Sequence, residues 1–365
     1  MRIPQRTLYF ALLFFFLFTG STAFANFADE PQHFFRGKVI SVEDVVSAHP
    51  FATLDQEAEV LLTSGPFRGE SVFISSTYIE NDYFLNVYLE KGTEIILVAS
   101  VEDGVIKEAY LHDIARDRGL YYLLAAFILL LLLVGRMQGL KTVITLVFTG
   151  IVIMKVILPL LLLGYEPIPV ATFSAIVIIV FTFLIIGGVN AKSFSAILGT
   201  VCGVTVAGLL ALWVGEISHL TGFNSEEAQM LSFMEQTINI RGLLFAGIII
   251  GSLGAVTDVG MSVASAASEI SCANPHISPY QLTRAALNVG RDIMGTMSNT
   301  LVLAYVGSAM PLLLLLLGYE MEWLKIINLD LIATEFVRGI AGSIGLIVAI
   351  PVTAAAAGFM MSRKK

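Results

Sequence analysis

The chain has 365 residues, of which 56% are hydrophobic and 14% charged, and its formal net charge is -8. Its mean hydropathy is +0.82. These values are typical of an integral membrane protein embedded in a lipid bilayer, and they exclude a nucleic-acid partner, because phosphate binding needs clustered Lys and Arg.

Residues 1–25 have the pattern of an export signal. Arg2 and Arg6 precede an apolar run at 7–18, and Ala23-Phe24-Ala25 matches the small-residue pattern of a cleavage site. The alternative is an uncleaved N-terminal anchor. In either case we expect the segment that follows to be exported.

Residues 26–118 form the expected exported domain. Alternating apolar and polar residues predict strands at 34–42, 59–63, 71–77 and 94–101, with turn signals at Gly65-Pro66 and Asp103-Gly104. We therefore predict a small antiparallel β-barrel. The segment has no Cys, and its histidines at 33, 49 and 112 are too scattered to indicate a metal site. A binding or gating role, with a protein partner, and a passive structural cap both remain open.

Residues 119–365 form the expected transmembrane helical domain, so the fold class is mainly α-helical and polytopic. Each apolar segment is close to the roughly 20 residues that a tilted helix needs to cross a bilayer. The sequence predicts seven spans, at 120–135, 142–163, 168–190, 194–217, 243–265, 292–317 and 339–361.

Charge between the spans predicts their orientation. With the β domain outside, the cytoplasmic connections carry cations and the external ones mostly carboxylates, as the positive-inside rule expects. We therefore expect a bacterial plasma (inner) membrane protein with an extracytoplasmic N-terminal domain and a cytoplasmic C-terminus. The cytoplasmic cations are Arg136, Lys141, Lys192, Arg284, Arg363, Lys364 and Lys365, and the external carboxylates are Glu226, Glu227, Glu235, Glu320, Glu322, Asp330 and Glu335.

One sequence pattern recurs in the helical part. Pro159 opens a Leu-rich run that ends at Glu166, and Pro311 opens a similar run that ends at Glu320. A parallel internal repeat is one interpretation, and chance recurrence of Leu-rich span ends is the other.

Charged and amide groups occur inside predicted spans, at Asp258, Glu269, Arg291, Asp292 and Asn299. Such a group at bilayer depth costs roughly 2.5 to 3.5 kcal/mol even on lenient insertion scales, so it usually marks a pathway or a binding site. At 1.5 Å per residue, Asp258 lies about 25 Å from Arg241, and Asn299 about 28 Å from Gly318. We therefore expect Asp258 and Asn299 to lie at one level.

These residues define the predicted site. Asp258, Asn299, Thr300 and Lys155 are the expected substrate- or ion-binding residues, and Glu269, Arg291, Asp292 and Asn288 the expected gate or ion pair. Small residues around Asp258, such as Gly251 and Gly254, allow close helix packing or a broken helix. The structural alternative is that Asp258 pairs with Arg291 or Lys155 and only holds the bundle together.

The same residues carry a family resemblance. The chain resembles the YibE/F family of bacterial membrane proteins in the runs GSLGAVTDVGMSVASAASEI at 251–270 and NVGRDIMGTMSNTLVLAYVGSAMPLLLLL at 288–316. The exported β domain and the loop NSEEAQML at 224–231 are similar to that family as well. The resemblance implies a membrane protein but no settled activity. The residues that match its motifs are Asp258, Glu269, Asn288, Gly290, Arg291, Asp292, Gly295, Thr296, Asn299 and Thr300.

Three function classes follow. The first is a permease for a small ion or small molecule, gradient-driven or passive. The second is a non-transporting scaffold or assembly factor whose exported domain binds a partner protein. The third is an intramembrane aspartyl protease using Asp258 and Asp292, which the lack of a Gly-x-Gly-Asp setting disfavours. No nucleotide-binding or metalloprotease motif occurs, so we expect no enzyme activity, cofactor or metal. The sequence leaves the oligomeric state open.

Overall fold

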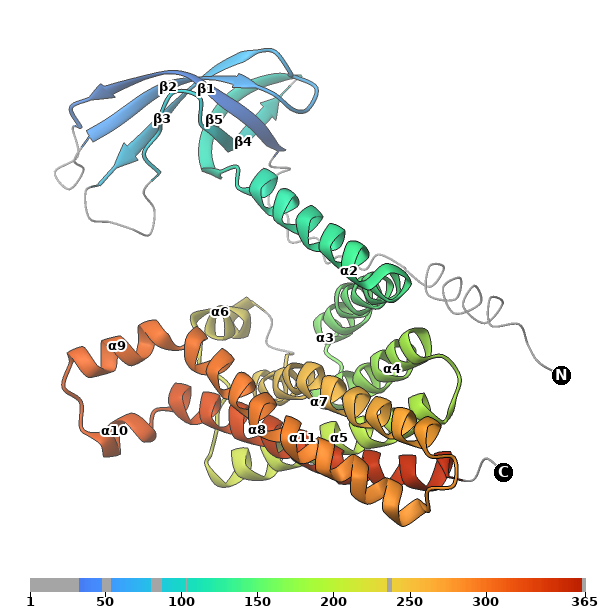
Figure 1. Ribbon diagram of the computed structural model, residues 1–365. Coiled ribbons are helices and arrows are strands. Elements are labelled where there is room, and N and C mark those ends of the chain that lie inside the picture. The colour runs from blue at the N-terminus through green and yellow to red at the C-terminus, as the bar shows by residue number, and fades with distance from the viewer. Residues whose placement is uncertain (1–32, 48–53, 80–86, 103, 235–237, 363–365) are drawn as a thin grey trace. The chain divides into compact units, whose positions relative to one another are not determined.

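The structure is a computed structural model that describes residues 33–47, 54–79, 87–102, 104–234 and 238–362 (Figure 1). The chain divides into two compact units, with the boundary between Leu130 and Leu131 inside a long helix. Several predictions concern residues outside the described part: the signal or anchor at 1–25, His49, Glu235, Arg363, Lys364 and Lys365.

The first unit is built on a five-stranded antiparallel sheet in the order β3-β2-β1-β4-β5. The edge strands β3 and β5 approach each other, so the sheet is a nearly closed barrel, which confirms the predicted architecture. One strand, β5, was not predicted. The strands are β1 (His33–Val45), β2 (Leu54–Leu62), β3 (Ser71–Tyr78), β4 (Glu94–Glu102) and β5 (Val105–Ile114).

The barrel core follows from the alternation of side chains along each strand. Ile95, Leu97 and Ala99 of β4 are all buried, and Phe35 and Val39 of β1 pack in the same cluster. Ile96 and Val98, between the buried residues of β4, are less buried, so a period of two sets the buried side of this strand, whereas a β-bulge between Val39 and Ser41 interrupts the period in β1.

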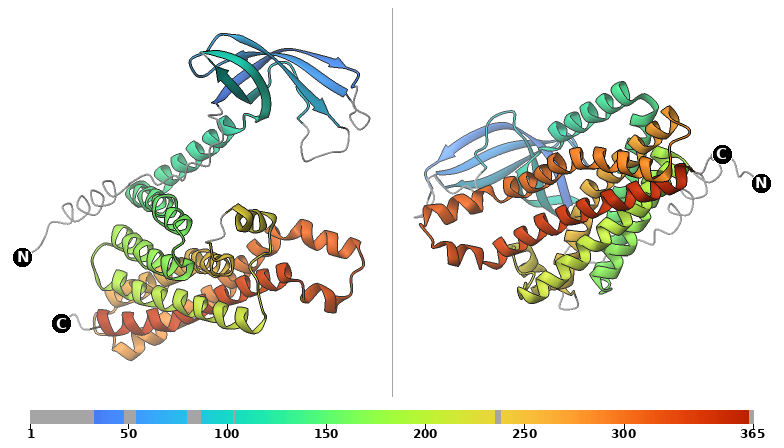
Figure 2. Two further views of the ribbon diagram at one scale, coloured as in Figure 1. Left: turned by 180° about the vertical axis from the view of Figure 1, so that it is seen from behind. Right: turned by 60° about the horizontal axis from the view of Figure 1, so that its bottom comes forward.

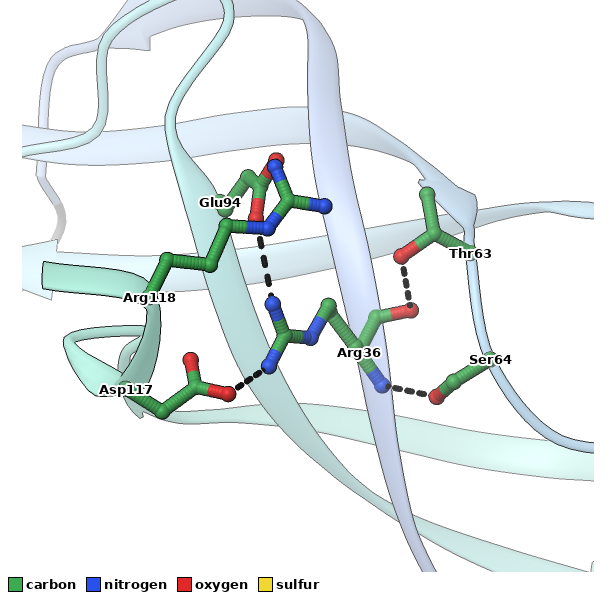
Figure 3. Close-up of polar contacts among 6 residues, drawn as sticks. All are labelled: Arg36, Thr63, Ser64, Glu94, Asp117 and Arg118. Carbon is green, nitrogen blue, oxygen red and sulfur yellow. Dashed lines mark hydrogen bonds and ion pairs between the residues drawn. The ribbon is translucent and has the colours of Figure 1, made fainter. Parts of the chain in front are cut away.

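Ion pairs tie the barrel to the first turn of the helix α2 (Asp117–Val152) (Figure 3). The guanidinium of Arg36 on β1 donates to Asp117 and, at 3.3 Å, to Glu94 of β4, while Arg118 pairs with Glu94 from the other side. The hydrogen bond to the Asp117 carboxylate raises the pKa of Arg36 above its ordinary value. Asp117 also lies at the positive end of the helix dipole. We name these four residues the barrel–helix junction.

The second unit contains the rest of the helices. After α2 come the π-helix η1 (Ile153–Ile157), α3 (Leu158–Leu162), α4 (Pro167–Gly187), α5 (Ala191–Ile217), α6 (Glu226–Met234), α7 (Ile240–Ala273), α8 (Pro279–Ser308), α9 (Met310–Gly318), α10 (Trp323–Ile327) and α11 (Asp330–Met361).

The helices make this a multi-pass membrane protein. By length and hydropathy, five described helices are candidate spans: Asp117–Leu162, Pro167–Gly187, Ala191–Ile217, Ile240–Ala273 and Asp330–Met361. The bent pair α8 and α9 would be a sixth, with 60° between its two parts. The predicted count of seven is therefore not reproduced.

The difference lies at 120–163, where the sequence predicts two spans and the structure has one helical stretch with a break. The backbone of Arg136 leaves the helical region, at φ 47° and ψ -123°. Residues eight apart in a continuous helix are about 12 Å apart along the axis. Gly139 instead lies so close to the Leu131 carbonyl that a Cβ there would clash with it. The chain thus turns back sharply at Arg136.

Proline distorts the backbone at two further places. Pro159 has no N–H to donate to the backbone carbonyl of Lys155, four residues earlier. The turn before Pro159 widens into the π-helix η1, and there the Leu158 N–H donates to the Ile153 carbonyl. Pro311 stands in the first turn of α9, directly after the 60° bend that interrupts the predicted span at 292–317.

Helix α7 is central in the helical unit. It packs against α4, α5, α8 and α11, and α11 packs in turn against α5 and α8 (Figures 1 and 2). Glycines bring α5 and α11 together, because a Cβ on Gly203 would meet the Gly345 carbonyl and a Cβ on Gly199 would clash with Thr353. Helix α8 lies at the edge of this group.

Candidate functional site

Asp258 lies near the middle of α7, at about 27 Å from one end of the helix and 22 Å from the other. Its side chain is exposed, on the same helix face as Gly247, Gly251 and Gly254. Asp258 makes no hydrogen bond or ion pair with any residue that the structure describes. An uncompensated carboxylate therefore lies at mid-span on a surface lined by glycine.

The polar residues of α8 lie on its outer face. Asn288, Arg291, Asp292, Asn299 and Thr300 are all exposed. The Arg291 guanidinium donates to the Asn288 amide oxygen at 3.2 Å, and the Thr300 hydroxyl donates to the Thr296 carbonyl at 2.9 Å. The Thr300 oxygen therefore keeps a lone pair that can bind a cation or accept another hydrogen bond.

The antiparallel hairpin of α7 and α8 sets the depth of each residue. A Cβ on Gly290 would lie 3.4 Å from a methyl group of Val263, so these two residues face each other. Counting away from this contact puts residue 295 opposite Asp258. Asn299 lies four residues further along, about 6 Å or one turn away. Asp258 and Asn299 are thus neighbours in depth without being directly opposite.

The same register separates the predicted gate residues. Glu269 comes opposite Arg284, whereas Arg291 comes opposite Ser262, about 10 Å away along the helix. In the described part of the chain, no ion pair within 4 Å involves Glu269, Arg291 or Asp292. Asp292 is only three residues from the level of Asp258, yet the two carboxyl groups share no hydrogen bond.

Lys155 lies within η1 and its side chain is exposed. The π-helix widens the backbone at this position, and such segments are frequent at functional sites. Lys155 stays a predicted member of the site, although Asp258 is not its hydrogen-bond or ion-pair partner.

Sequence reasoning missed a third polar cluster at the opposite end of the α7–α8 hairpin from Glu269. Arg338 and Glu335 of α11 form an ion pair at 3.0 Å, with side chains 28% and 20% exposed. Arg338 also lies over the ring of Tyr305 on α8, at 5.9 Å, and a Cβ on Gly251 would meet the Tyr305 hydroxyl at 3.0 Å. Glu335 Oε2 and Arg338 Nε are buried with no partner among the described residues. We call Tyr305, Glu335 and Arg338 the α8–α11 clamp.

Two cavities adjoin the clamp. One, of about 270 Å³, is apolar and lies between α8, α9 and α11, with Tyr305 and Glu335 in its wall. The other, of about 260 Å³, has Arg338, Asn224 and Glu227 in its wall. A third cavity, of about 280 Å³, lies at the far end of α7, beside Lys192 and Cys272. These cavities show that space adjoins the polar clusters at both ends of α7.

The described side chains contain no group of three His, Cys, Asp or Glu residues that could hold a metal ion. Cys202 and Cys272 are free thiols.

The fold and these polar groups define a multi-pass membrane protein with a compact β-barrel domain and ionisable residues within its spans. Residues 123–363 match the YibE/F-like protein family, so the chain belongs to that family. The β-barrel lies outside the matched residues. No curated protein and no solved structure matches the chain.

Proposed function

We propose that this protein is a permease that moves a small cation or a small cationic molecule along the exposed faces of α7 and α8. The observation that carries the proposal is the mid-span carboxylate of Asp258, which has no partner among the described residues. A carboxylate costs too much free energy at that depth to face lipid uncompensated, and binding a cation or proton would remove that cost.

The neighbouring residues have chemistry suited to the same ligand. Asn299 and Thr300, on the outer face of α8, offer neutral oxygen atoms at a depth about one turn from that of Asp258, and the Gly254 backbone beside Asp258 is open to close approach. Arg291, Asp292 and Asn288 form the barrier on one side, with Glu269 further along. The α8–α11 clamp forms the barrier on the other side. Barriers at both ends are what alternating access requires, with an ion gradient or a downhill movement as the driving force.

The charge distribution orients this pathway in our proposal. The barrel domain is extracytoplasmic, the C-terminus is cytoplasmic, and the membrane is the plasma membrane of a bacterium.

Cation binding tests the proposal before the transported species is known. Purified protein is titrated with Na⁺, K⁺ or Li⁺ at constant ionic strength, and with protons, and its unfolding temperature is followed. We expect one of these to raise the unfolding temperature of the wild type and not of Asp258→Asn, because a ligand bound only by the folded state stabilises it. Glu322→Gln, an exposed carboxylate beside α10, is the control that should keep the response.

The flux of that cation into proteoliposomes is then measured under a potassium diffusion potential. Wild type and Glu322→Gln should conduct, and Asp258→Asn should lose at least about 10-fold, the equivalent of about 1.4 kcal/mol. An Asp258→Asn variant that is folded and as active as the wild type would refute the proposal.

A second candidate function rests on the outer surface of the barrel. Phe34 of β1 and Tyr110 of β5 are 58% and 57% exposed, and both pair with Val98 of β4, so they lie in one cross-strand row. His112 packs edge-on against Phe34. An exposed aromatic row of this kind favours binding of a partner protein, as in a scaffold or assembly factor. Phe34→Ala/Tyr110→Ala should then abolish cross-linking to that partner without lowering the unfolding temperature of the protein.

A further inference from the structure

Helix α8 has one face that nothing in the described chain covers. Its described neighbours in the bundle are α7 and α11, and the buried residues Leu282, Ala286, Gly290 and Leu301 face them. The exposed residues follow a helical period on the other side, where they form a polar stripe: Gln281, Arg284, Asn288, Arg291, Asp292, Gly295, Thr296 and Asn299.

Hydrocarbon is a poor neighbour for this stripe. Guanidinium, carboxylate and amide groups in a membrane are found against protein or enclosed water, not against acyl chains. The stripe therefore needs a covering surface that offers both positive and negative charge.

The positions of the residues on α8 identify that surface. At about 100° per residue, Asn288 and Gly295 lie near the middle of the stripe, with Arg291 on one flank and Asp292 on the other. Two copies in one membrane share their orientation, so a two-fold axis between them runs along the membrane normal. Rotation about that axis brings Arg291 of each copy opposite Asp292 of the other, at the same depth. The stripe is thus complementary to itself in charge.

The spacing along α8 fits the same packing. Gln281, Asn288, Gly295 and Val302 recur every seven residues, which is the period of a left-handed helix pair. A Cβ on Gly295 would meet nothing within 4 Å, so the partner helix has room to approach the backbone. An Asn at the centre of such a seam can hydrogen-bond to its counterpart in the other helix.

We propose that the protein is a homodimer in the membrane, formed by α8 of one copy packing in parallel against α8 of the second through this polar stripe. Arg291 and Asp292 form two reciprocal ion pairs across the seam. The barrier residues of the proposed permease, Arg291, Asp292 and Asn288, lie in this seam, and self-association can be tested without measuring flux.

Charge reversal tests the ion pairs. The full-length protein is reconstituted at increasing protein-to-lipid ratios, and association is followed by energy transfer between labelled copies. We expect Arg291→Asp and Asp292→Arg each to weaken self-association at least 10-fold. Mixing these two variants should restore it, because the mixed pair regains both ion pairs. The matched controls, Lys325→Asp and Glu322→Arg, reverse exposed charges near α10 and should associate like the wild type.

Cysteine cross-linking tests the seam and identifies its occupant. In a Cys202→Ser/Cys272→Ser background, Gly295→Cys should form a disulfide-linked dimer in native membranes. Gly307→Cys should not, because residue 307 lies about 120° around the helix from residue 295, although its Cβ is equally open. An unchanged unfolding temperature shows that each variant is folded.

A wild-type protein that stays monomeric at the highest protein-to-lipid ratio would overturn the dimer. So would a mixture of the two reversed variants that associates no better than each alone. Cross-linking of Gly295→Cys to a different polypeptide, or within its own chain, would show that another occupant covers the stripe.

Discussion

Gly203 of α5 lies directly against the backbone of α11. A Cβ at this position would come 2.5 Å from the Gly345 carbonyl and within 3 Å of Val256 and Ala349. Gly345 and Ala349 belong to α11 and Val256 to α7, and both helices pack against each other. The added methyl group would therefore separate α5 from α11.

We therefore predict that Gly203→Ala destabilises the protein, by about 1–3 kcal/mol as is usual for overpacking. The matched control is Gly150→Ala on α2, where a Cβ meets nothing within 4 Å. Because Ala has the higher helix propensity, the control should be neutral or stabilising, by up to about 1 kcal/mol. In detergent, Gly203→Ala should lower the unfolding temperature and Gly150→Ala should leave it unchanged or raise it, and an equal response of the two variants would contradict this account.

Asp113, at the end of β5, gives a prediction about pH. The guanidinium of Arg116 donates to its carboxylate at 2.6 Å, and this hydrogen bond holds the pKa of Asp113 below its ordinary value. A lowered pKa in the folded state means that the pair stabilises the fold above the unfolded pKa of about 3.9, and that this contribution is lost as pH falls through the folded value.

Replacing Arg116 with Ala should raise the pKa of Asp113 toward the ordinary range, as read from carboxyl carbon shifts in an NMR titration. The change in stability at neutral pH should be small, because Asp113 and Arg116 are 43% and 63% exposed. If the pKa of Asp113 does not change in the variant, the hydrogen bond from the backbone N–H of Ile114 lowers it instead.

At the scale of elements, the barrel–helix junction stabilises the first turn of α2. Arg36 is shared between Glu94 and Asp117, and Asp117 Oδ1 has no described partner to replace it. Partly exposed pairs contribute up to about 1 kcal/mol each.

Arg36→Ala, which removes the pair with Asp117, should therefore loosen the first turn of α2 by up to about 1 kcal/mol. Hydrogen exchange of a peptide spanning 111–124 should accelerate by up to about 5-fold, the factor that this free energy implies. Lys38→Ala on the same strand is the control, since Lys38 forms no ion pair with any residue that the structure describes. Exchange as slow in Arg36→Ala as in the control would mean that the turn is held without the ion pairs.

The elements also show what the sequence could and could not predict. Four strands follow from a period of two, but β5 carries Lys, Glu, His and Asp among its apolar residues, and its pairing with β4 outweighs its polar composition. The ends of α4 and α5 follow from hydropathy. Helix α11 begins well before its apolar segment, so Glu335 and Arg338 read as loop residues although they lie on a helix at i, i+3.

The candidate site, too, could be predicted from the sequence only in part. Charge within an apolar segment is visible in the sequence, so Asp258 and the polar residues of α8 could be named. Which of them are neighbours depends on the register of the α7–α8 hairpin, and that is set by contacts such as Val263 with Gly290. The α8–α11 clamp joins residues about 30 positions apart, and no local pattern indicates such a contact.

At the scale of the whole molecule, the number of spans and the sidedness of the chain must agree. If the barrel and the C-terminus lie on opposite sides, the chain crosses the membrane an odd number of times after the barrel. Five spans satisfy this, with α8 and α9 as a re-entrant pair. So do seven, if the break at Arg136 makes two crossings of Asp117–Leu162 and the bent pair makes one. Six crossings would put both ends on one side.

Labelling of single cysteines distinguishes these cases. Three reporters are placed in a chain without other cysteines: Ser75→Cys on β3, the natural Cys272 in the last turn of α7, and Glu320→Cys after α9, all at exposed positions. With a membrane-impermeant maleimide on intact spheroplasts, we expect Ser75→Cys and Glu320→Cys to react in both cases. Cys272 decides between five and seven. With seven crossings, Cys272 follows the fifth and reacts only in inverted vesicles, as the cations on its side favour. With five crossings, it follows the fourth and reacts from the outside, and Pro311 then marks the point where the chain reverses inside the membrane. Glu320→Cys reacting only in inverted vesicles would put the C-terminus outside and overturn the predicted orientation.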